Sequence, residues 1–185
     1  VHGGDSITPD VKQGATLTLK KIPCVPPAPF TIEIGGGEGA TDAEIVAPVL
    51  LNFNADGSTE GQEIQGWSYG LCVKDPDKLE ILGATIDGTQ TATIRDGGPP
   101  SYDQIRVFEG AGVIHAVVID FDAVITIPAQ NGWHDLNVTY KILMDTEGDV
   151  TYVTPCNKTL GVPPVANVMV IGGDSIPASE FEGID

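Results

Sequence analysis

The sequence predicts an all-β sandwich or barrel, and three observations support this. Short runs rich in β-branched and aromatic residues follow one another, separated by turn-forming stretches such as NADG, KDPD and DTEGD. Gly (23) and Pro (14) are abundant, as in a chain with many tight turns. Only 40–44 and 100–104 suggest single helical turns, because no longer stretch holds a 3.6-residue apolar period. The predicted strands cover residues 15–22, 30–34, 46–53, 64–73, 78–86, 90–95, 103–108, 112–121, 136–144, 149–154 and 165–171.

Alternation within two of these runs predicts how they face the core. In IQGWSYGLCV (64–73), the set Gln65, Trp67, Tyr69, Leu71 and Val73 is expected to point to the core, and the smaller set beginning with Ile64 to lie under a neighbouring layer or at the surface. In GVIHAVVIDF (112–121), both alternating sets are almost entirely apolar. That pattern predicts a central strand covered on both sides.

The chain divides into three predicted parts. Residues 1–29 hold one strand-like run followed by PCVPPAP, so we read them as a connecting strand and a Pro-rich linker. Residues 30–171 form the compact domain. Residues 172–185 are predicted to begin the next connector, because they repeat features of residues 3–16.

The repeated feature is the pentapeptide GGDSI. It occurs as Gly3, Gly4, Asp5, Ser6 and Ile7, and again as Gly172, Gly173, Asp174, Ser175 and Ile176. In both copies a Val stands two residues before the first Gly, and a further Gly follows the Ile after six intervening residues. A domain that ends by restarting its own first segment predicts assembly with copies of itself, head to tail. The copies would be fused in tandem or would exchange terminal strands.

The charge and the sequons restrict the partners and the location. A formal net charge of −17 would repel nucleic-acid backbones and anionic membrane surfaces, so neither is an expected partner. No apolar run approaches the roughly 18 residues of a membrane span, so we expect no membrane insertion. The sequons at Asn137 and Asn157 indicate export. We therefore expect an extracellular or cell-surface protein, with any export signal removed or outside this segment.

The three cysteines leave the disulfide pairing open. Any two of Cys24, Cys72 and Cys156 could bond, and buried free thiols are the alternative. In an oxidising compartment we expect Cys72 to pair with Cys156, because both lie in or beside strand-like runs. Cys24 would then be free, or bonded to another chain.

Residues 52–63 contain the most specific local pattern. They match the twelve-residue calcium loop D-x-[DN]-x-[DN]-G-x5-E at every defined position except the first, where an Asn replaces the Asp. The flanks are strand-like rather than helical, and NADG is also good hairpin sequence, so a plain hairpin is the competing interpretation. No cofactor is otherwise expected. The candidate Ca²⁺ ligands are Asn52, Asn54, Asp56, Ser58, Glu60 and Glu63.

Two other motifs do not support catalysis. The stretch GWSYG (66–70) matches the G-x-S-x-G pattern of serine hydrolases, but that motif requires a strand-to-helix turn. Here the period-two alternation continues through Ser68, and each of the three His residues is better explained as a structural side chain. GGGEG (35–39) lacks the Lys-Ser/Thr of a phosphate loop and precedes acidic residues. We therefore expect no enzyme.

Three stretches resemble cohesin modules, the receptor domains of cellulosome scaffoldins. IQGWSYGLCVKDPDKLEILGATI is similar to the family's second and third strands, and FTIEIGGGEGATDAEIVAPVLLNF to its opening strand, acidic loop and next strand. LNVTYKILMDTEGDVTYVT resembles its penultimate hairpin, so the likeness covers about residues 30–171. The resemblance implies an antiparallel jelly-roll sandwich without catalytic activity that binds a partner protein on a sheet face. Cys72, Cys156 and the tail GVPPVANVMVIGGDSI depart from the family, and no dockerin-contact pattern is present, so dockerin binding is not carried over.

Two functions from different classes follow. The first is a structural module of an extracellular tandem-repeat or filament-forming protein, assembling head to tail through its terminal strands. The alternative is a calcium-dependent adhesion or binding module for a glycan or a protein. Calorimetry with calcium discriminates between them, and the gene's full reading frame around these residues is the most useful single observation.

Overall fold

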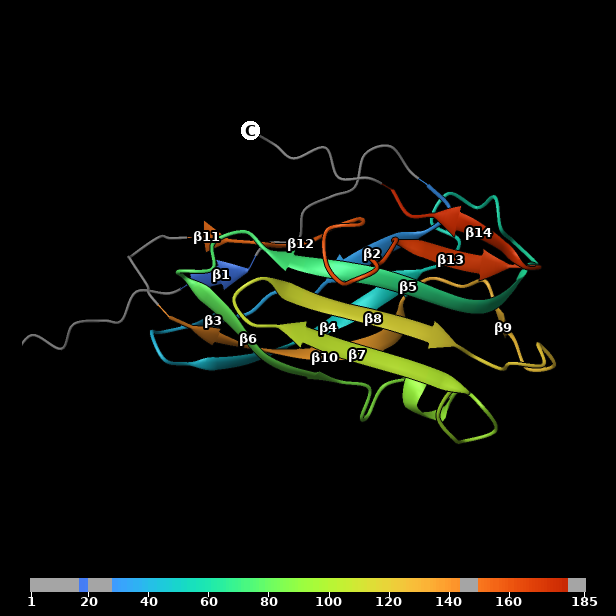
Figure 1. Ribbon diagram of the computed structural model, residues 1–185, viewed down its shortest axis with the longest axis horizontal. Coiled ribbons are helices and arrows are strands. Elements are labelled where there is room, and N and C mark those ends of the chain that lie inside the picture. The colour runs from blue at the N-terminus through green and yellow to red at the C-terminus, as the bar shows by residue number, and fades with distance from the viewer. Residues whose placement is uncertain (1–16, 20–27, 144–149, 180–185) are drawn as a thin grey trace, which may run out of the picture.

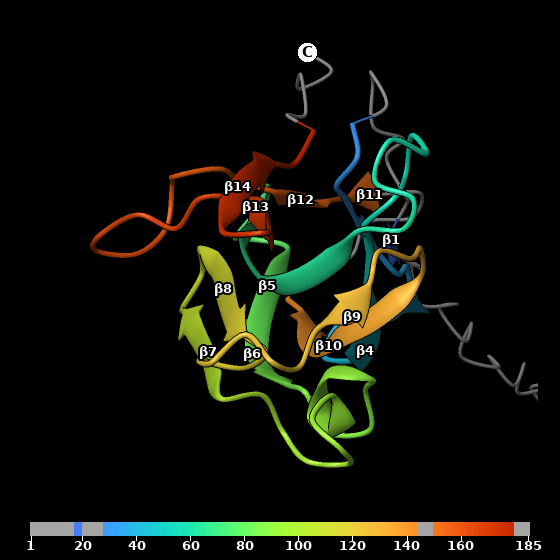
Figure 2. The ribbon, with the colours of Figure 1, turned by 90° about the vertical axis from the view of Figure 1, so that its right-hand side faces the viewer.

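The structure, a computed structural model, describes residues 17–19, 28–143 and 150–179. These residues form two packed β-sheets, as Figures 1 and 2 show, with a small third sheet at one end. The single 3-10 turn Thr91–Thr93 (η1) is the only helical element among the described residues. The predicted all-β sandwich is confirmed.

The first layer, here called the small sheet, has four antiparallel strands. Their order is β2 (Thr31–Ile34), β4 (Glu44–Asn52), β10 (Trp133–Ile142) and β6 (Leu79–Thr85). β10 lies between β4 and β6, with a register shift between His134 and Leu136 on the β4 side.

The second layer, here called the large sheet, is built around β5 (Glu63–Val73), the longest strand. Its order is β14 (Asp174–Pro177), β13 (Val168–Ile171), β5, β8 (Gly112–Val118) and β7 (Tyr102–Phe108). The short strands β9 (Ile127–Pro128) and β12 (Val153–Pro155) also pair with β5. β7 therefore forms one edge of this sheet.

The third sheet holds the N-terminal strand that the sequence predicts. β1 (Leu17–Leu19) pairs antiparallel with β3 (Glu38–Gly39) and parallel with β11 (Val150–Thr151). The predicted Pro-rich linker lies largely outside the described residues. β1 thus pairs with its own domain at the left end of Figure 1.

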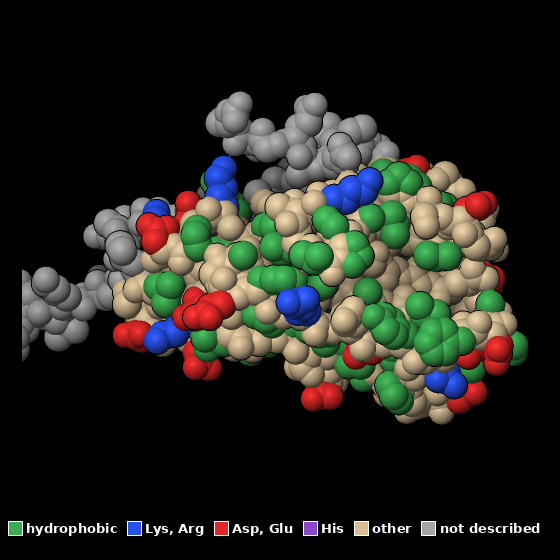
Figure 3. Space-filling view, viewed as in Figure 1, with side chains coloured by type: hydrophobic (Ala, Val, Ile, Leu, Met, Phe, Trp, Pro, Cys, Tyr) green, Lys and Arg blue, Asp and Glu red, His purple; other side chains and the backbone are tan. Residues whose placement is uncertain are grey.

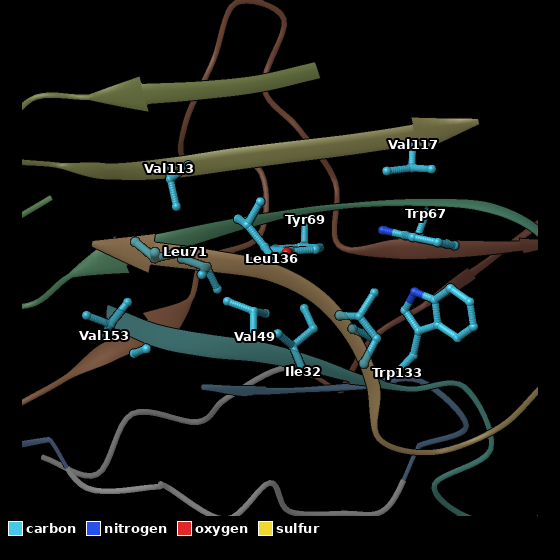
Figure 4. Packing of buried hydrophobic residues seen from close by; sticks show 14 of the residues in the cluster. Ile32, Val49, Trp67, Tyr69, Leu71, Val113, Val117, Trp133, Leu136 and Val153 are labelled. Atoms are coloured by element: carbon cyan, nitrogen blue, oxygen red, sulfur yellow. The ribbon is translucent and has the colours of Figure 1, made fainter. Parts of the chain in front are cut away.

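The core fills the space between the two layers. Buried side chains of β4 and β10 meet those of β5 and β8, as Figure 4 shows for Val49, Leu136, Leu71 and Val113. At one end the aromatic rings are in series: the centroid of Phe53 lies 5.6 Å from that of Phe30 and 5.2 Å from that of Trp67. Large rings at these separations supply much of the buried apolar area of such a domain.

The facing predicted for β5 is correct for most of the strand and wrong at its start. Trp67, Tyr69 and Leu71 are buried in the core as predicted. Ile64, assigned to the outer set, is also fully buried, and Gln65 is only half-buried. The cause is a register shift in the β13 pairing between Val170 and Ile171, which inserts one extra residue in β5 and reverses the alternation before it.

Four further expectations are corrected. The run 90–95 contains η1 rather than a strand, and 100–104 enters β7 rather than forming a helical turn. The stretch 40–44 is not a helical turn either: the Ala43 N–H donates to the Ala40 carbonyl, but Asp42 has a φ of 68° and Glu44 begins β4. β8 is central, but its outer face is only partly covered, because Ala116 and Val118 are half-buried.

The predicted domain boundary at residue 171 falls inside a hairpin. Gly172 and Gly173 form the turn between β13 and β14 with φ of 58° and 86°, a conformation that favours glycine. β14 pairs back on β13, and the Ser179 N–H donates to the Phe30 carbonyl. The large sheet therefore continues past the predicted start of the connector.

Candidate functional site

The outer face of the large sheet carries almost no charge, although the chain has a formal net charge of −17. Since side chains alternate along a strand, one set of each strand points to the core and the other to the outside. The outward set is Tyr102, Gln104, Arg106 and Phe108 on β7, Ile114, Ala116 and Val118 on β8, Gly66, Ser68, Gly70 and Cys72 on β5, and Val168 and Val170 on β13. Arg106 is the single charged member. Figure 3 shows this face as a largely apolar and uncharged surface.

The connection between β12 and β13, residues 156–167, forms a wall that covers part of this face: Ile114 is only 4% exposed, and a Cβ at Gly161 would lie 3.6 Å from its Cδ1. Ser68 Oγ donates to the Ala166 carbonyl at 2.8 Å, and the Gly70 N–H donates to Asn167 Oδ1 at 2.9 Å. A Cβ at Gly70 would lie 2.9 Å from the Cys156 carbonyl oxygen, so the close approach requires glycine there. Figure 2 shows the connection projecting from the outer side of the large sheet, and its residue Val162 is 95% exposed.

The loop after β8 presents apolar side chains at the other end of the face. Phe121 is 70% exposed and Val124 is 81% exposed. The loop is held by Asp120, whose Oδ2 accepts the N–H groups of Val124 at 3.1 Å and Ile125 at 3.3 Å. Those backbone hydrogen bonds, with the neighbouring Arg95, lower the pKa of the Asp120 carboxyl against the opposing effect of desolvation. The apolar tip is thus a fixed structure rather than an extended loop.

Tyr102 joins this tip to the sheet. It pairs with Val118 on β8 and is 39% exposed, and the Ser101 N–H beside it donates to the Ile119 carbonyl. Its hydroxyl donates to Gln104 Oε1 at 2.7 Å. Large exposed apolar side chains gathered at one place are typical of interaction surfaces.

Beneath the face lies a buried polar cluster that the sequence analysis did not identify. Asp135 of β10 is fully buried, and its Oδ1 accepts hydrogen bonds from Trp67 Nε1 at 3.1 Å and Thr91 Oγ1 at 2.7 Å. Its Oδ2 accepts from Tyr69 Oη at 2.6 Å and lies 2.7 Å from His115 Nδ1. His115 Nε2 in turn lies 2.7 Å from Asp103 Oδ1 of β7.

The imidazole in this cluster is positively charged near neutral pH. Burial lowers the pKa of His115, but the charges of Asp135 and Asp103 and their hydrogen bonds outweigh burial and raise it to about 9. Burial and the Asp135 carboxylate also raise the pKa of the Tyr69 hydroxyl, which stays neutral and donates. The cluster is satisfied within the chain, so it positions β5, β7, β8 and β10 relative to one another. One signal in the sequence could have revealed this cluster. Asp135 is an acidic residue within WHDLNV, among the core positions of a strand.

The candidate calcium ligands are divided between the core and an exposed loop. Asn52 is buried in β4, where its Nδ2 donates to Thr31 Oγ1 at 3.1 Å and its Oδ1 accepts the Gly132 N–H at 2.8 Å. Asn54 Oδ1 accepts the Thr59 N–H, and Asp56 Oδ1 accepts both the N–H and the hydroxyl of Ser58. Among the described residues no three His, Cys, Asp or Glu side chains gather as a metal-binding group.

The three acidic candidate ligands of this loop have different surroundings. The Ser58 hydrogen bonds lower the pKa of Asp56, and Glu60 is exposed near the loop tip. Glu63 begins β5, and its Oε2 accepts the Thr126 hydroxyl at 2.8 Å. The loop is therefore stabilised by its own hydrogen bonds, and Ca²⁺ binding stays a prediction.

The disulfide prediction is confirmed. Cys72 and Cys156 are bonded across 84 residues of chain with a Cα–Cα distance of 5.6 Å, which joins β5 to the start of the 156–167 wall. Cys24 lies outside the described residues.

The sequons lie on different surfaces. Asn137 sits on the outer face of β10, where its Nδ2 donates to the Asp87 carbonyl at 3.1 Å. Asn157 is exposed in the 156–167 wall, and its Oδ1 accepts the Asn167 N–H at 3.1 Å. Whether either carries a glycan stays a prediction.

Of the two GGDSI copies, only the second is described, and it forms the β13–β14 turn and strand. Gly3, Gly4, Asp5, Ser6 and Ile7 lie outside the described residues. No helix among the described residues is long and apolar enough to cross a membrane.

Comparison with known proteins identifies the fold. No protein-family model matches the chain, and no curated protein matches it. Among solved structures, the chain is similar to the sixth cohesin of scaffoldin B from Acetivibrio cellulolyticus, in complex with a mutant dockerin. The TM-score is 0.54 at 15% identity, over 82% of this chain and 93% of that one. The fold is therefore a cohesin-like β-sandwich, as the sequence resemblance predicts.

Proposed function

We propose that this chain is a non-catalytic protein-binding module that holds its partner on the outer face of the large sheet. The observation that carries the proposal is the uncharged face itself. Although the chain has 26 Asp and Glu residues, Arg106 is the only charged residue in the outward set of β5, β7, β8 and β13. Depletion of charged residues at the centre of a surface is the compositional mark of a binding interface.

Anchors for such a partner lie at one end of the face. Phe121, Val124 and Tyr102 expose apolar area on a loop and a strand that are held by hydrogen bonds, so little ordering is needed on binding. The 156–167 wall would limit the partner on the other side. An interface that combines fixed apolar anchors with a bounding wall favours a partner with a complementary apolar ridge.

The border of the face indicates the partner's charge. Glu109 and Asp122 lie in turns at the border of the face, Asp174 begins β14, and all three are exposed. Because complementary potentials steer association, the partner is expected to carry basic residues around an apolar centre. The similarity to a cohesin crystallised with a dockerin supports a protein, rather than a small molecule, as the ligand class.

The absence of catalysis is supported by the state of the polar side chains. Ser68 of the G-x-S-x-G pattern lies within strand β5 and donates to the Ala166 carbonyl of the 156–167 wall, and His115 is fully buried between two carboxylates. Neither has the nucleophile–base geometry of a hydrolase.

The proposal is tested with one charge placed on each side of the sandwich. Ala116→Glu puts a carboxylate in the centre of the large sheet's outer face, and Val46→Glu places the same group on the outer face of the small sheet, where Val46 is 62% exposed. The partner is first identified by affinity capture with the wild-type chain. Calorimetry with the purified partner should then show at least tenfold weaker binding for Ala116→Glu and unchanged binding for Val46→Glu. Equal binding by both variants would exclude this face.

We infer separately that the module belongs to an extracellular protein built from several copies. The repeated GGDSI segment supports head-to-tail repetition, in tandem or through exchanged terminal strands, and the Cys72–Cys156 disulfide supports an oxidising compartment. Electron microscopy of the purified protein at high concentration tests strand exchange. Strictly monomeric particles from a gene that encodes one copy would refute head-to-tail assembly.

A further inference from the structure

Strand β7 is an open edge of the large sheet. The Val73 N–H donates to the Ala111 carbonyl and the Ile119 N–H donates to the Gln65 carbonyl, so the odd-numbered residues of β8 exchange main-chain hydrogen bonds with β5. The even-numbered residues of β8 therefore face β7, where the unshifted register pairs them with Tyr102, Gln104, Arg106 and Phe108. The N–H and C=O groups of Asp103, Ile105 and Val107 point to the other side, where the described chain places no hydrogen-bonded strand.

This edge lacks most of the features that prevent pairing with another chain. β7 is seven residues long, contains neither proline nor lysine, and has no bulge in its register. Its one inward-pointing charge, Asp103, is met by His115 Nε2 at 2.7 Å within the same chain. Unpaired main-chain groups on a long regular edge are a template for an added strand.

We propose that a second copy of this chain pairs antiparallel with β7 about a two-fold axis at Ile105. This axis aligns all seven residues of Tyr102–Phe108 with the same strand of the other copy. Gln104 then lies opposite Arg106 of the second copy, and Tyr102 lies opposite its Phe108. All four side chains project from the outer face, so each pair joins an amide to a guanidinium or one aromatic ring to another.

The side chains favour this register over its neighbours. An axis at Arg106 would set the two guanidinium groups directly opposite each other, which is unfavourable. An axis at Gln104 would shorten the paired length and leave Phe108 without a cross-strand ring. The pairing extends the large sheet across both copies and leaves both outer faces open on the same side, so partner binding does not depend on it.

The net charge opposes the association and therefore gives the dimer a characteristic dependence on salt. Two chains of −17 repel each other, and added salt screens this repulsion. The dimer is therefore expected to strengthen as the salt concentration rises.

Substitutions at Gln104 test the register with opposite signs. Gln104→Glu places a carboxylate opposite Arg106 of the second copy, and Gln104→Lys places a second cation there. The two-fold symmetry makes each cross-strand pair occur twice in the dimer, so each substitution acts twice. Sedimentation equilibrium should show a dimer about three- to tenfold tighter for Gln104→Glu and weaker by a similar factor for Gln104→Lys. General repulsion between acidic chains predicts the reverse order, because Gln104→Lys lowers the net charge.

A backbone variant provides an independent test. The Ile105 N–H faces away from β8, so Ile105→Pro removes a donor of the open edge and none of the sheet's own. We expect Ile105→Pro to be monomeric with an unchanged far-ultraviolet spectrum, and the matched Ile105→Ala, which removes the same side-chain packing, to remain dimeric. A wild-type chain that stays monomeric at millimolar concentration and high salt would overturn the proposal. So would a dimer with the reversed Glu and Lys order, or one that Ile105→Pro leaves intact while folded. None of these outcomes bears on the sheet-face interface, which the Ala116→Glu experiment tests separately.

Discussion

His115 Nδ1 lies 2.7 Å from Asp135 Oδ2, and both side chains are fully buried between the two sheets. Asp135 accepts from donors on β5, η1 and β8, while His115 continues the chain of hydrogen bonds to Asp103 on β7. A buried carboxylate requires such compensation, because burying an unpaired charge is very costly. This pair therefore fixes how the strands beneath the proposed binding face sit relative to one another.

Replacing Asp135 with Ala should strongly destabilise the fold. The substitution leaves an imidazolium and three further donors buried without their acceptor, and removing one partner of a buried ion pair costs about 3 to 5 kcal/mol. Urea denaturation measures the loss in unfolding free energy. The matched Asp103→Asn variant, whose side chain is partly exposed, should lose only about 1 kcal/mol. Equal losses for the two variants would show that Asp135 is not the centre of the cluster.

The stability should fall as the pH rises from neutral to alkaline. The pKa of His115 is about 9 in the fold against 6.5 as the reference value, so its contribution is fully present below pH 6.5 and is lost as pH rises through 9. The difference corresponds to about 3 kcal/mol. Denaturation at pH 6 and pH 9.5 measures it, and nitrogen-15 imidazole shifts should show a protonated ring at pH 8. A neutral ring at pH 7 would contradict the prediction.

Two buried tyrosines should respond oppositely to removal of their hydroxyls. The Tyr140 hydroxyl is buried without a hydrogen-bond partner in the described structure, and burial raises its pKa. Tyr140→Phe should therefore raise the unfolding free energy by about 1 kcal/mol, because an unsatisfied polar group is removed. The Tyr69 hydroxyl donates to Asp135, so Tyr69→Phe should lower the free energy by about 1 to 2 kcal/mol. Melting temperatures of the two variants give the signs directly.

Reduction of the Cys72–Cys156 disulfide should destabilise the chain by about 3 kcal/mol. The bond closes a long loop, and its loss increases the freedom of the unfolded chain. Thermal unfolding with and without reductant measures the effect. Alkylation under non-reducing conditions, followed by mass spectrometry, should label Cys24 alone if it is free. A monomer without any labelled cysteine would contradict both predicted states of Cys24.

The calcium hypothesis makes its own prediction. If Asp56, Ser58 and Glu60 bind Ca²⁺ in the exposed loop, calorimetry should record heat at millimolar Ca²⁺ and the melting temperature should rise. Asp56→Ala should remove both effects. No heat and no shift at that concentration would refute the hypothesis.

Local patterns were sufficient to predict most strands and the fold class. Period-two alternation placed Trp67, Tyr69 and Leu71 in the core, and the strand-like runs around Cys72 and Cys156 favoured the correct disulfide. The same reasoning was wrong for Ile64 and for residues 90–95. In the first case a register shift depends on the pairing with a distant strand. In the second, the Thr91 hydroxyl donates to Asp135, a contact far away in sequence.

The sequence by itself determined that this chain is all-β, strongly acidic and carries a repeated GGDSI, and it favoured the Cys72–Cys156 disulfide without excluding the other pairings. Each of these features depends on composition, alternation or spacing along the chain. The tertiary structure alone decided that Asp135 meets His115, that Asn52 turns into the core, and that an uncharged face and an open β7 edge result. Those features depend on which distant strands become neighbours, because hydrogen bonding, burial and exposure are set by contacts across the sheets.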